Sequence, residues 1–560
     1  MKSHSSTYQK ALRLQKKIFQ SLKTEADRLL GPLPESISRY RRETRMDFQD
    51  SQCHFNKVDK IDLIASVRSA DVTFIADFHT FKQSQKTALR IMKESIQEPD
   101  HWSIGLEMIS SHYQSELDQF QRGELSVEDF HQRISYLEEW GFPWSHYSLI
   151  FEWAKENKIK LIALNRPKPI FRGSENQELE HRDEWAAGII TDFFHDQIQK
   201  SIPAQMIVLY GELHVGTQHL PAQLTQISKN FLKSPLNWVT IHQNDDLLFW
   251  KIARHNHVLQ TEIIKLKNNT YCVFSSTPWA KLQSLMSWLE GCSPDESDPA
   301  ENDYLSLLQS FGNTITDFLG EPPPSYESMS ICTLEQTEII NRLRPQDGFT
   351  RNELKLIKFH ATANQRLYIP KVSIAYLGSP SLNGVAELAA IHLLKSKTGV
   401  KHLFHYTMDD FSRLALEAAF GFFGSLILNP RRKYDLPKDH LKRVKELKKT
   451  NRPLFRFEKE ARLLGVQALK KDISSIKNLK INIKNKRQGP TILMGAKYLG
   501  RILGARLHQA VLSEVVQLEW IRKLFFLPPD SNPSFFEERL RELKTATASI
   551  QTHLSKTDQL

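Results

Sequence analysis

The stretch VTFIADFHTFKQSQ, residues 72–85, pairs a short hydrophobic run with a polar ending. The run stops at Asp77, and His79 follows two positions later. A β-rich apolar run of this length, bounded by polar residues, is typical of a buried strand. Asp and His are common where strands enter turns, because their side chains cap helices or bond the local backbone. They are also the side chains of acid–base and metal chemistry, so the ending has two interpretations.

A second stretch, QMIVLYGELHVGTQ at residues 205–218, repeats the pattern. Its apolar run is followed by Glu212 and, two positions later, by His214. In extended backbone, residues two apart point to the same side, so each acid is expected beside its histidine. Two hydrophobic segments with the same acid-x-His ending predict one shared site.

Strand-like and helix-like segments alternate through the first half of the chain. Helix-period stretches such as QKTALRIMKESIQ and SLIFEWAKENK separate β-rich runs at 72–76, 103–107, 160–164, 205–210, 237–242 and 271–275. Strands that alternate with helices of this length predict an α/β fold, in which helices flank a largely parallel sheet.

The ends of these strands carry the candidate site residues. In an open α/β sheet, ligands bind in the crevice beyond the carboxyl ends of the strands. Four predicted strands are followed there by polar side chains, namely Asp77 and His79, Glu107, Asn165 and Arg166, and Glu212 and His214. If the strands run parallel, we expect His79 and His214 to meet at one edge of the sheet. The alternative is that these residues only shape the turns.

Several segments resemble a known family in their order and spacing. FIADFHTFKQSQ, IGLEMISSHYQSELDQFQRGELS, WSHYSLIFEWAKENKIKLIALN and IVLYGELHVG are similar to the ChaN-like haem-binding uptake proteins. The wider superfamily includes Tiki metalloproteases, TraB proteins and erythromycin esterases. The resemblance covers about residues 55–290. It implies an α/β fold with a strand-end pocket, and its motif positions are Asp77, His79, Glu107, Glu212 and His214. The family usually has G-E-x-H where this chain has ADFH.

The resemblance implies binding of haem, iron or a related small ligand. Haem would need an apolar pocket and an axial His or Tyr. The expected ligand-binding residues are Asp77, His79, Tyr147, Glu212 and His214.

A hydrolase is the alternative. A divalent metal held by His79, His214, Asp77 and Glu212 could activate water, or a metal-free His–carboxylate pair could act as general base. The catalytic candidates are then Glu107, Asn165 and Arg166. Whether there is turnover stays open at this point.

The sequence predicts two domains. An N-terminal amphipathic helix is expected within residues 1–49, the α/β domain over 50–292, an acidic, Pro- and Ser-rich linker over 293–303, and a predominantly α-helical domain over 304–560. No known family gives the helical domain an activity.

Basic charge is concentrated in the helical domain. The chain has a net charge of +11, and residues 431–490 alone hold 20 Lys and Arg against 6 Asp and Glu. This basic window could contact nucleic acid or anionic lipid, which would make the chain a binding or scaffold protein. The alternative is a solvated helix face. The N-terminus lacks the apolar run of a secretory signal and no apolar stretch has the length of a membrane span, so a cytoplasmic location is expected.

Overall fold

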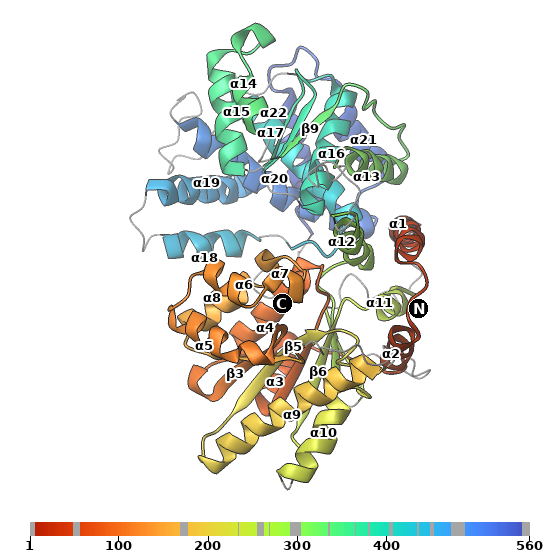
Figure 1. Ribbon diagram of the computed structural model, residues 1–560. Helices are drawn as coiled ribbons and strands as arrows, with labels where there is room; N and C mark the ends of the chain where they lie inside the picture. Colours follow the sequence, from red (N-terminus) through yellow and green to blue (C-terminus); the bar gives the residue numbers. More distant parts are fainter. Residues whose placement is uncertain are drawn as a thin grey trace. The chain divides into compact units, whose positions relative to one another are not determined.

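The computed structural model describes residues 6–48, 56–167, 177–232, 234–254, 262–267, 269–291, 304–333, 337–364, 366–378, 381–401, 407–433, 436–447, 453–471 and 488–550. The chain divides into two compact units (Figure 1). The α/β unit comprises residues 19–295, and the helical unit comprises residues 1–18 and 296–559. The predicted linker, residues 293–303, lies outside the described residues.

An eight-stranded sheet forms the centre of the α/β unit. Its strands are β1 (Asn56–Lys57), β2 (Val72–Asp77), β3 (Trp102–Ser110), β4 (Lys160–Asn165), β5 (Gln205–Gly211), β6 (Trp238–Gln243), β7 (Ile263–Lys265) and β8 (Thr270–Val273). They are ordered β1-β7-β8-β6-β2-β5-β3-β4. All six predicted strands are present and pair in parallel, which confirms the α/β prediction. The two strands that were not predicted, β1 and β7, are short and pair antiparallel at one edge.

The central strands are buried on both faces, which explains their nearly continuous apolar sequences. Along β2 the residues alternate: Val72, Phe74 and Ala76 contact one hydrophobic cluster, and Ile75 contacts the other. The first cluster includes α9 (Glu178–Gln199) and α10 (Leu220–Phe231).

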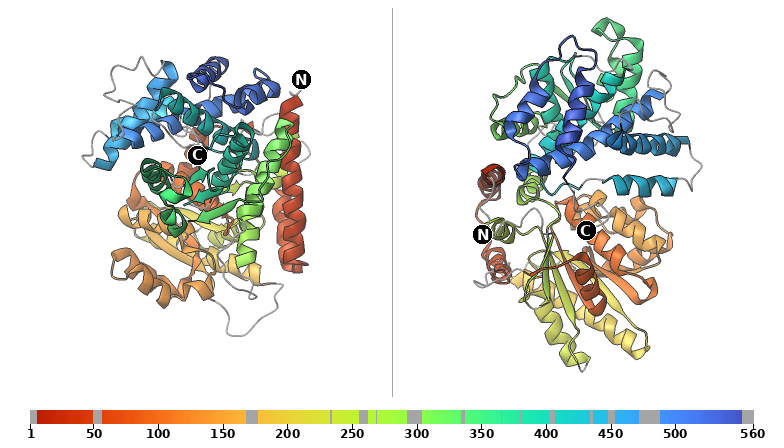
Figure 2. Two further views of the ribbon diagram at one scale, coloured as in Figure 1. Left: turned by 90° about the horizontal axis from the view of Figure 1, so that it is seen from above. Right: turned by 180° about the vertical axis from the view of Figure 1, so that it is seen from behind.

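The opposite face of the sheet is covered by α3 (Lys60–Ser69), α4 (Lys82–Ser95), α5 (Gln114–Arg122) and α8 (Ser148–Glu156) (Figure 1, Figure 2). The remaining helices of the unit are α2 (Glu35–Met46), α6 (Val127–Arg133), α7 (Tyr136–Glu139), α11 (Asp246–Arg254) and α12 (Pro278–Gly291).

The N-terminal segment forms two helices where one was predicted. They are α1 (Ser6–Leu30) and α2, and the boundary between the units falls inside α1. Tyr8, Ala11 and Phe19 form the buried stripe of α1, while Leu29 is 41% exposed. The helix is amphipathic as expected, and aromatic and alanine side chains dominate its buried face.

The helical unit is predominantly α-helical, as the sequence predicts, and it also contains a small sheet. Its helices are α13 (Tyr304–Leu319), α14 (Thr337–Arg342), α15 (Arg351–Asn364), α16 (Leu382–Thr398), α17 (Met408–Leu428), α18 (Pro437–Leu447), α19 (Pro453–Lys470), α20 (Gly489–Leu512), α21 (Leu518–Phe526) and α22 (Phe535–Ala546). The sheet was not predicted, and its order is β10 (Arg366–Ile369), β11 (Ile374–Leu377) and β9 (Ser330–Thr333).

Helix α17 is the core helix of this unit. It is the one helix among the described residues that is long and apolar enough to cross a membrane, and 83% of its apolar stretch is buried. It packs against α20 at backbone distance, because Gly500 and Gly504 face the carbonyl oxygens of Ala415 and Ala419. The apolar sequence of α17 is thus explained by burial inside the unit.

Candidate functional site

The candidate site lies at the carboxyl ends of β2, β5 and β3. The chain passes from β2 to β3 and β4 and then returns, so that β5 lies between β2 and β3, and β6 lies on the other side of β2. This reversal is the kind of switch point at which α/β sheets bind ligands. Asp77 and Gly211 are register partners, so the ends of β2 and β5 are level.

Asp77 organises the first half of the site. Its Oδ2 lies 2.9 Å from His79 Nδ1 and accepts a hydrogen bond of 2.8 Å from the Tyr147 hydroxyl. Its Oδ1 accepts a hydrogen bond from the Gln85 side chain. Asp77 and Tyr147 are buried. Since Asp77 engages Nδ1 of the imidazole, Nε2 of His79 is the nitrogen left to face a ligand.

Glu107, on β3, occupies the centre of the site. It forms an ion pair with Arg182, and its Oε2 accepts a hydrogen bond of 2.5 Å from the Gly211 backbone N–H. His79 Nε2 lies 3.9 Å from the same oxygen. The Glu107 side chain is 2% exposed, so Arg182 and the backbone donor stabilise a buried carboxylate.

Asp183 organises the second half. Its Oδ1 lies 2.6 Å from His214 Nδ1, and its Oδ2 accepts a hydrogen bond of 3.0 Å from the Tyr40 hydroxyl. Tyr40 comes from α2, Asp183 from α9, and His214 from the segment after β5. The site therefore contains two Asp–His pairs, built from segments far apart in the sequence.

Gly211 lies where the two halves meet. A Cβ atom at this position would be 3.2 Å from Glu107 Oε2 and 3.4 Å from both His79 Nε2 and His214 Cδ2. The structure thus brings Asp77, His79, Glu107 and His214 together, and the absence of a side chain at Gly211 leaves the space between them.

Three predicted residues have other partners. Glu212 forms an ion pair with Lys281, and Arg166 Nη1 lies 3.2 Å from Glu178 Oε2. Asn165 Oδ1 accepts a hydrogen bond of 3.2 Å from Arg182 Nε, so Asn165 contacts the site only through Arg182. Tyr147 is completely buried; its hydroxyl donates to Asp77, and its ring lies 6.2 Å from that of Trp140.

Sequence reasoning missed four site residues, which are Tyr40, Gln85, Arg182 and Asp183. None of them follows a strand directly, so a search of strand ends could not find them. Arg182 and Asp183 lie in the charged run EHRDEW near the start of α9. Asp183 lies at helical spacing from Ala186, Ala187 and Ile190 in the buried stripe of α9, and a helical periodicity analysis could have detected an acid in that position.

Burial and neighbouring charges shift the pKa values of three groups in the site. Burial works against the protonated imidazole of His79, but the hydrogen bond to Asp77 and the charge of Glu107 outweigh it and raise the pKa of His79. Burial also opposes ionisation of Glu107, yet Arg182 and His79 hold its pKa below the ordinary value. Burial, followed by the charge of Asp77, raises the pKa of Tyr147, so its hydroxyl remains a donor.

Aromatic side chains surround the exposed part of His79. The ring centroid of Trp140 is 4.6 Å and that of Phe142 is 4.9 Å from the His79 ring, and Phe142 stacks on Trp288 at 4.9 Å. The His79 side chain is 23% exposed, whereas that of His214 is 6% exposed. A ligand can therefore approach His79, but not His214, without rearrangement.

The predicted divalent metal site is not seen in this arrangement. Within the described part of the chain, no group of three or more His, Cys, Asp or Glu side chains has the geometry to hold a metal ion. Of the four residues expected as ligands, Glu212 pairs with Lys281, and the Nδ1 atoms of His79 and His214 are engaged by Asp77 and Asp183. The cluster is instead a set of oriented imidazoles and paired charges.

Comparisons with known proteins give a family match and a match to a solved structure. No curated protein matches the chain. A solved structure titled "Cofacial heme binding to ChaN of Campylobacter jejuni" is 15% identical, with a TM-score of 0.26, and the match covers 34% of this chain and 88% of that one. Residues 63–206, which include Asp77, His79, Glu107, Arg182 and Asp183, match the family described as haem-binding uptake, Tiki superfamily, ChaN.

Proposed function

We propose that the α/β unit binds haem or a related iron ligand at the strand-end site, with His79 as its axial ligand. The family description of the matched segment supports this proposal. The observation that carries it is the state of His79: one ring nitrogen is held by Asp77, the other makes no hydrogen bond to a described residue, and the side chain is partly exposed.

The residues present fit such a ligand. A histidine that ligates a metal usually donates its second N–H to a carboxylate, which orients the ring and increases its basicity. Asp77 stands in that position toward His79. Trp140 and Phe142 supply apolar faces that would pack against a flat macrocycle. Bound haem would supply a redox-active iron, and the chain's own groups would bind and orient it.

Titration of the purified protein with haem, followed by the Soret band, tests the proposal. His79→Ala should remove saturable binding, because the axial donor is lost. His181→Ala is the matched control, since His181 is an exposed histidine near the start of α9, one residue from Arg182. Unchanged haem affinity in the His79 variant would show that iron is held elsewhere.

A second proposal, hydrolysis by a His–carboxylate pair, is favoured by the Asp183–His214 pair and the Glu107–Arg182 ion pair, which haem binding alone does not need. His79 Nε2 would take a proton from water as the water attacks an ester carbonyl. The imidazolium would then return that proton to the leaving alkoxide. Asp77 would orient the imidazole throughout.

Haem-free protein separates the two proposals. A hydrolase should cleave activated esters without haem, and His79→Ala should reduce kcat by about 10²-fold or more. If the protein only binds haem, wild type and His79→Ala should cleave the ester at the same background rate. Activity that survives in His79→Ala at the wild-type rate excludes this candidate.

We further propose a polyanion contact through the basic window, residues 431–490. Among its described residues, α18 buries Val444 and Leu447 and exposes Lys442, Arg443 and Lys445. Arg432 does not belong to this surface, because it is buried. Binding of DNA, RNA and anionic vesicles should be measured at two salt concentrations, and affinity should fall steeply with salt if counterions are released. No binding at low salt would leave a solvated helix face.

A further inference from the structure

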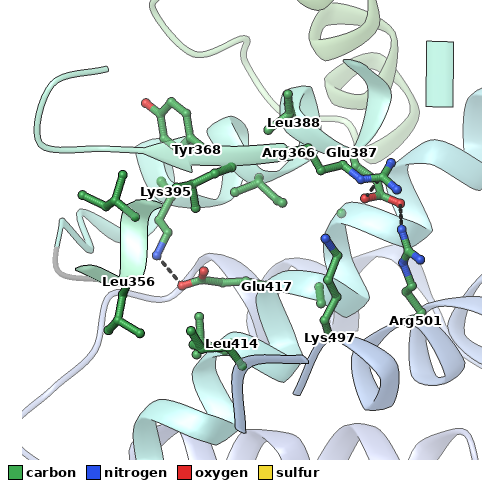
Figure 3. Close-up of a pocket in the computed structure, with 16 residues that line it drawn as sticks. Leu356, Arg366, Tyr368, Glu387, Leu388, Lys395, Leu414, Glu417, Lys497 and Arg501 are labelled. Atoms are coloured by element: carbon green, nitrogen blue, oxygen red, sulfur yellow. Dashed lines mark hydrogen bonds and ion pairs between the residues drawn. The ribbon is translucent and has the colours of Figure 1, made fainter. Parts of the chain in front are cut away.

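The helical unit contains a cavity that the strand-end site does not use. Its volume is about 100 Å³, and its walls come from α15, β10, α16, α17 and α20 (Figure 3). Aliphatic side chains form most of the walls, among them Leu356, Leu367, Ile391, Leu414 and Leu493. On α17 the lining residues Ala418 and Gly421 have a small side chain or none.

One wall of this cavity concentrates positive charge around a single carboxylate. Glu387 Oε2 lies 3.2 Å from Arg366 Nη1, and Glu387 Oε1 lies 3.3 Å from Arg501 Nη2. Arg432 forms a third ion pair with Glu387. The Glu387 side chain is 6% exposed. One carboxylate therefore faces three guanidinium groups, and two positive charges remain in excess.

Lys497 adds a fourth cation to the same wall. It lies one helical turn before Arg501 on α20, and Figure 3 shows its ammonium group directed into the cavity. Among the described residues it has no hydrogen bond or ion pair. Lys395, on the other side of the cavity, differs because it is paired with Glu417 (Figure 3).

An ammonium group in this position is costly without a counter-charge. Burial, together with the repulsion of Arg366 and Arg501, lowers the pKa of Lys497 well below its ordinary value, and Glu387 only partly offsets this. The cluster lacks negative charge, and an anion held next to Lys497 would supply it. Guanidinium and ammonium groups are also the side chains that bind phosphate and carboxylate groups best.

We propose that this cavity binds a small amphiphilic anion, with its phosphate or carboxylate group at Lys497 and Arg501 and its aliphatic body against the leucines. Charge on one wall and hydrocarbon on the others match the two parts of such a molecule. The proposal rests on residues of the helical unit alone and is independent of any ligand of the strand-end site.

Four compounds with matched parts test the proposal by calorimetry on the full-length protein. Hexyl phosphate and hexanoate carry both parts, hexanol lacks the charge, and inorganic phosphate lacks the hydrocarbon. At least one amphiphilic anion should bind about ten-fold more tightly than hexanol and inorganic phosphate, roughly 1.4 kcal/mol. The tighter of the two anions identifies the oxyanion group. If hexanol or inorganic phosphate equals both anions, or if none of the four binds, the proposal is wrong.

Two variants locate the binding. Lys497→Met keeps the length of the side chain and should weaken anion binding about ten-fold, while Lys523→Met, at an exposed lysine of α21, should not. Leu367→Trp, at a half-buried position of the cavity wall on β10, should fill the cavity and weaken binding of the hydrocarbon. Unchanged affinity in both Lys497→Met and Leu367→Trp would place the anion elsewhere and overturn the proposal.

Proton uptake gives a readout that loss of stability cannot imitate. An anion beside Lys497 should raise the pKa of its ammonium group, so binding should take up protons from the buffer at a pH between the pKa of the free protein and that of the complex. Calorimetry in two buffers of different ionisation enthalpy measures this number. Wild type should show uptake and Lys497→Met should show less; equal uptake in the two proteins contradicts the assignment of the ammonium group.

Discussion

The imidazole of His214 pairs with Asp183, at 2.6 Å from Nδ1 to Oδ1, and not with Glu212, its neighbour in the acid-x-His pattern. At His79 the pattern does describe the pair, because Asp77 Oδ2 lies 2.9 Å from His79 Nδ1. The two similar stretches thus produce two similar Asp–His pairs by different routes. The second route needs α9, which presents Asp183 from outside the sheet.

Removal of the charge at Asp183 should therefore lower the free energy of unfolding more than removal of the charge at Glu212. Asp183 is 1% exposed and accepts hydrogen bonds from Tyr40 and His214, so Asp183→Asn should lower the free energy of unfolding by about 1–3 kcal/mol. Glu212 is 31% exposed. When its charge is removed, Asp245 and Asp246 still lie near Lys281. Glu212→Gln should cost about 1 kcal/mol or less. Urea unfolding followed by tryptophan fluorescence compares the variants. If Glu212→Gln destabilised the protein more than Asp183→Asn, Glu212 would be the acid that pairs with His214.

Gly211 offers a test of the site that leaves its polar groups intact. In Gly211→Ala the new methyl group would lie 3.2 Å from Glu107 Oε2 and 3.4 Å from His79 Nε2. We expect the fold to persist with a small loss of stability, and haem affinity or esterase rate to fall about ten-fold or more, because the methyl group fills the space between the two histidines. Circular dichroism and the ligand titration measure the two effects separately. Full function in the alanine variant would exclude this space as the binding position.

The sequence predicts the sheet well because its central strands are buried on both faces. A short apolar run such as that of β5 is typical of a strand buried on both faces. The alternation of such strands with helices predicts that they pair in parallel. The two short strands β1 and β7 were missed, since segments of two or three residues, Asn56–Lys57 and Ile263–Lys265, carry no pattern. The small sheet of the helical unit was also missed: its strands have only four residues each, and unlike β8 they do not continue a regular alternation of strands and helices.

The site was predicted only in part, because strand ends are a local signal and the partners of the histidines are not local. Asp77 and His79 are two residues apart and could be paired from the sequence. Tyr40, Asp183 and His214 come from three separate segments, and only the packing of α2 and α9 on the sheet brings them together. The strand-end rule finds the histidines, but tertiary structure decides which acid each one meets.

Asp245 should make stability depend on pH. This half-buried residue follows β6, and its Oδ1 accepts a hydrogen bond of 2.8 Å from the Leu248 backbone N–H at the start of α11. Burial and the charge of Asp246 raise its pKa from 3.8 to about 7. Between those values the folded protein binds a proton that the unfolded chain has released. The free energy of unfolding should therefore fall as the pH rises through this window.

Asp245→Asn is the matching variant, because an amide oxygen can still accept the hydrogen bond from Leu248 while the charge is absent. The variant should lose the part of the pH dependence that belongs to this carboxyl. Urea midpoints at intervals from about pH 4 to pH 7 give the slope for each protein. Parallel slopes in wild type and variant would mean that Asp245 is ionised throughout.

The close packing of α17 against α20 predicts that one added methyl group on α20 destabilises the helical unit. A Cβ atom at Gly500 would lie 2.4 Å from the Ala415 carbonyl oxygen and 2.6 Å from Ala418 Cβ, and backbone cannot move aside without separating the helices. Gly500→Ala should therefore destabilise the helical unit by about 1–3 kcal/mol or more, although alanine is the better helix former.

Gly188→Ala, within α9, is the control, because nothing lies within 4 Å of the added methyl group. It should stabilise its unit by about 0.5–1 kcal/mol. Thermal unfolding of both variants checks the opposite signs, and a stabilising Gly500→Ala would show that α17 and α20 do not meet at backbone distance.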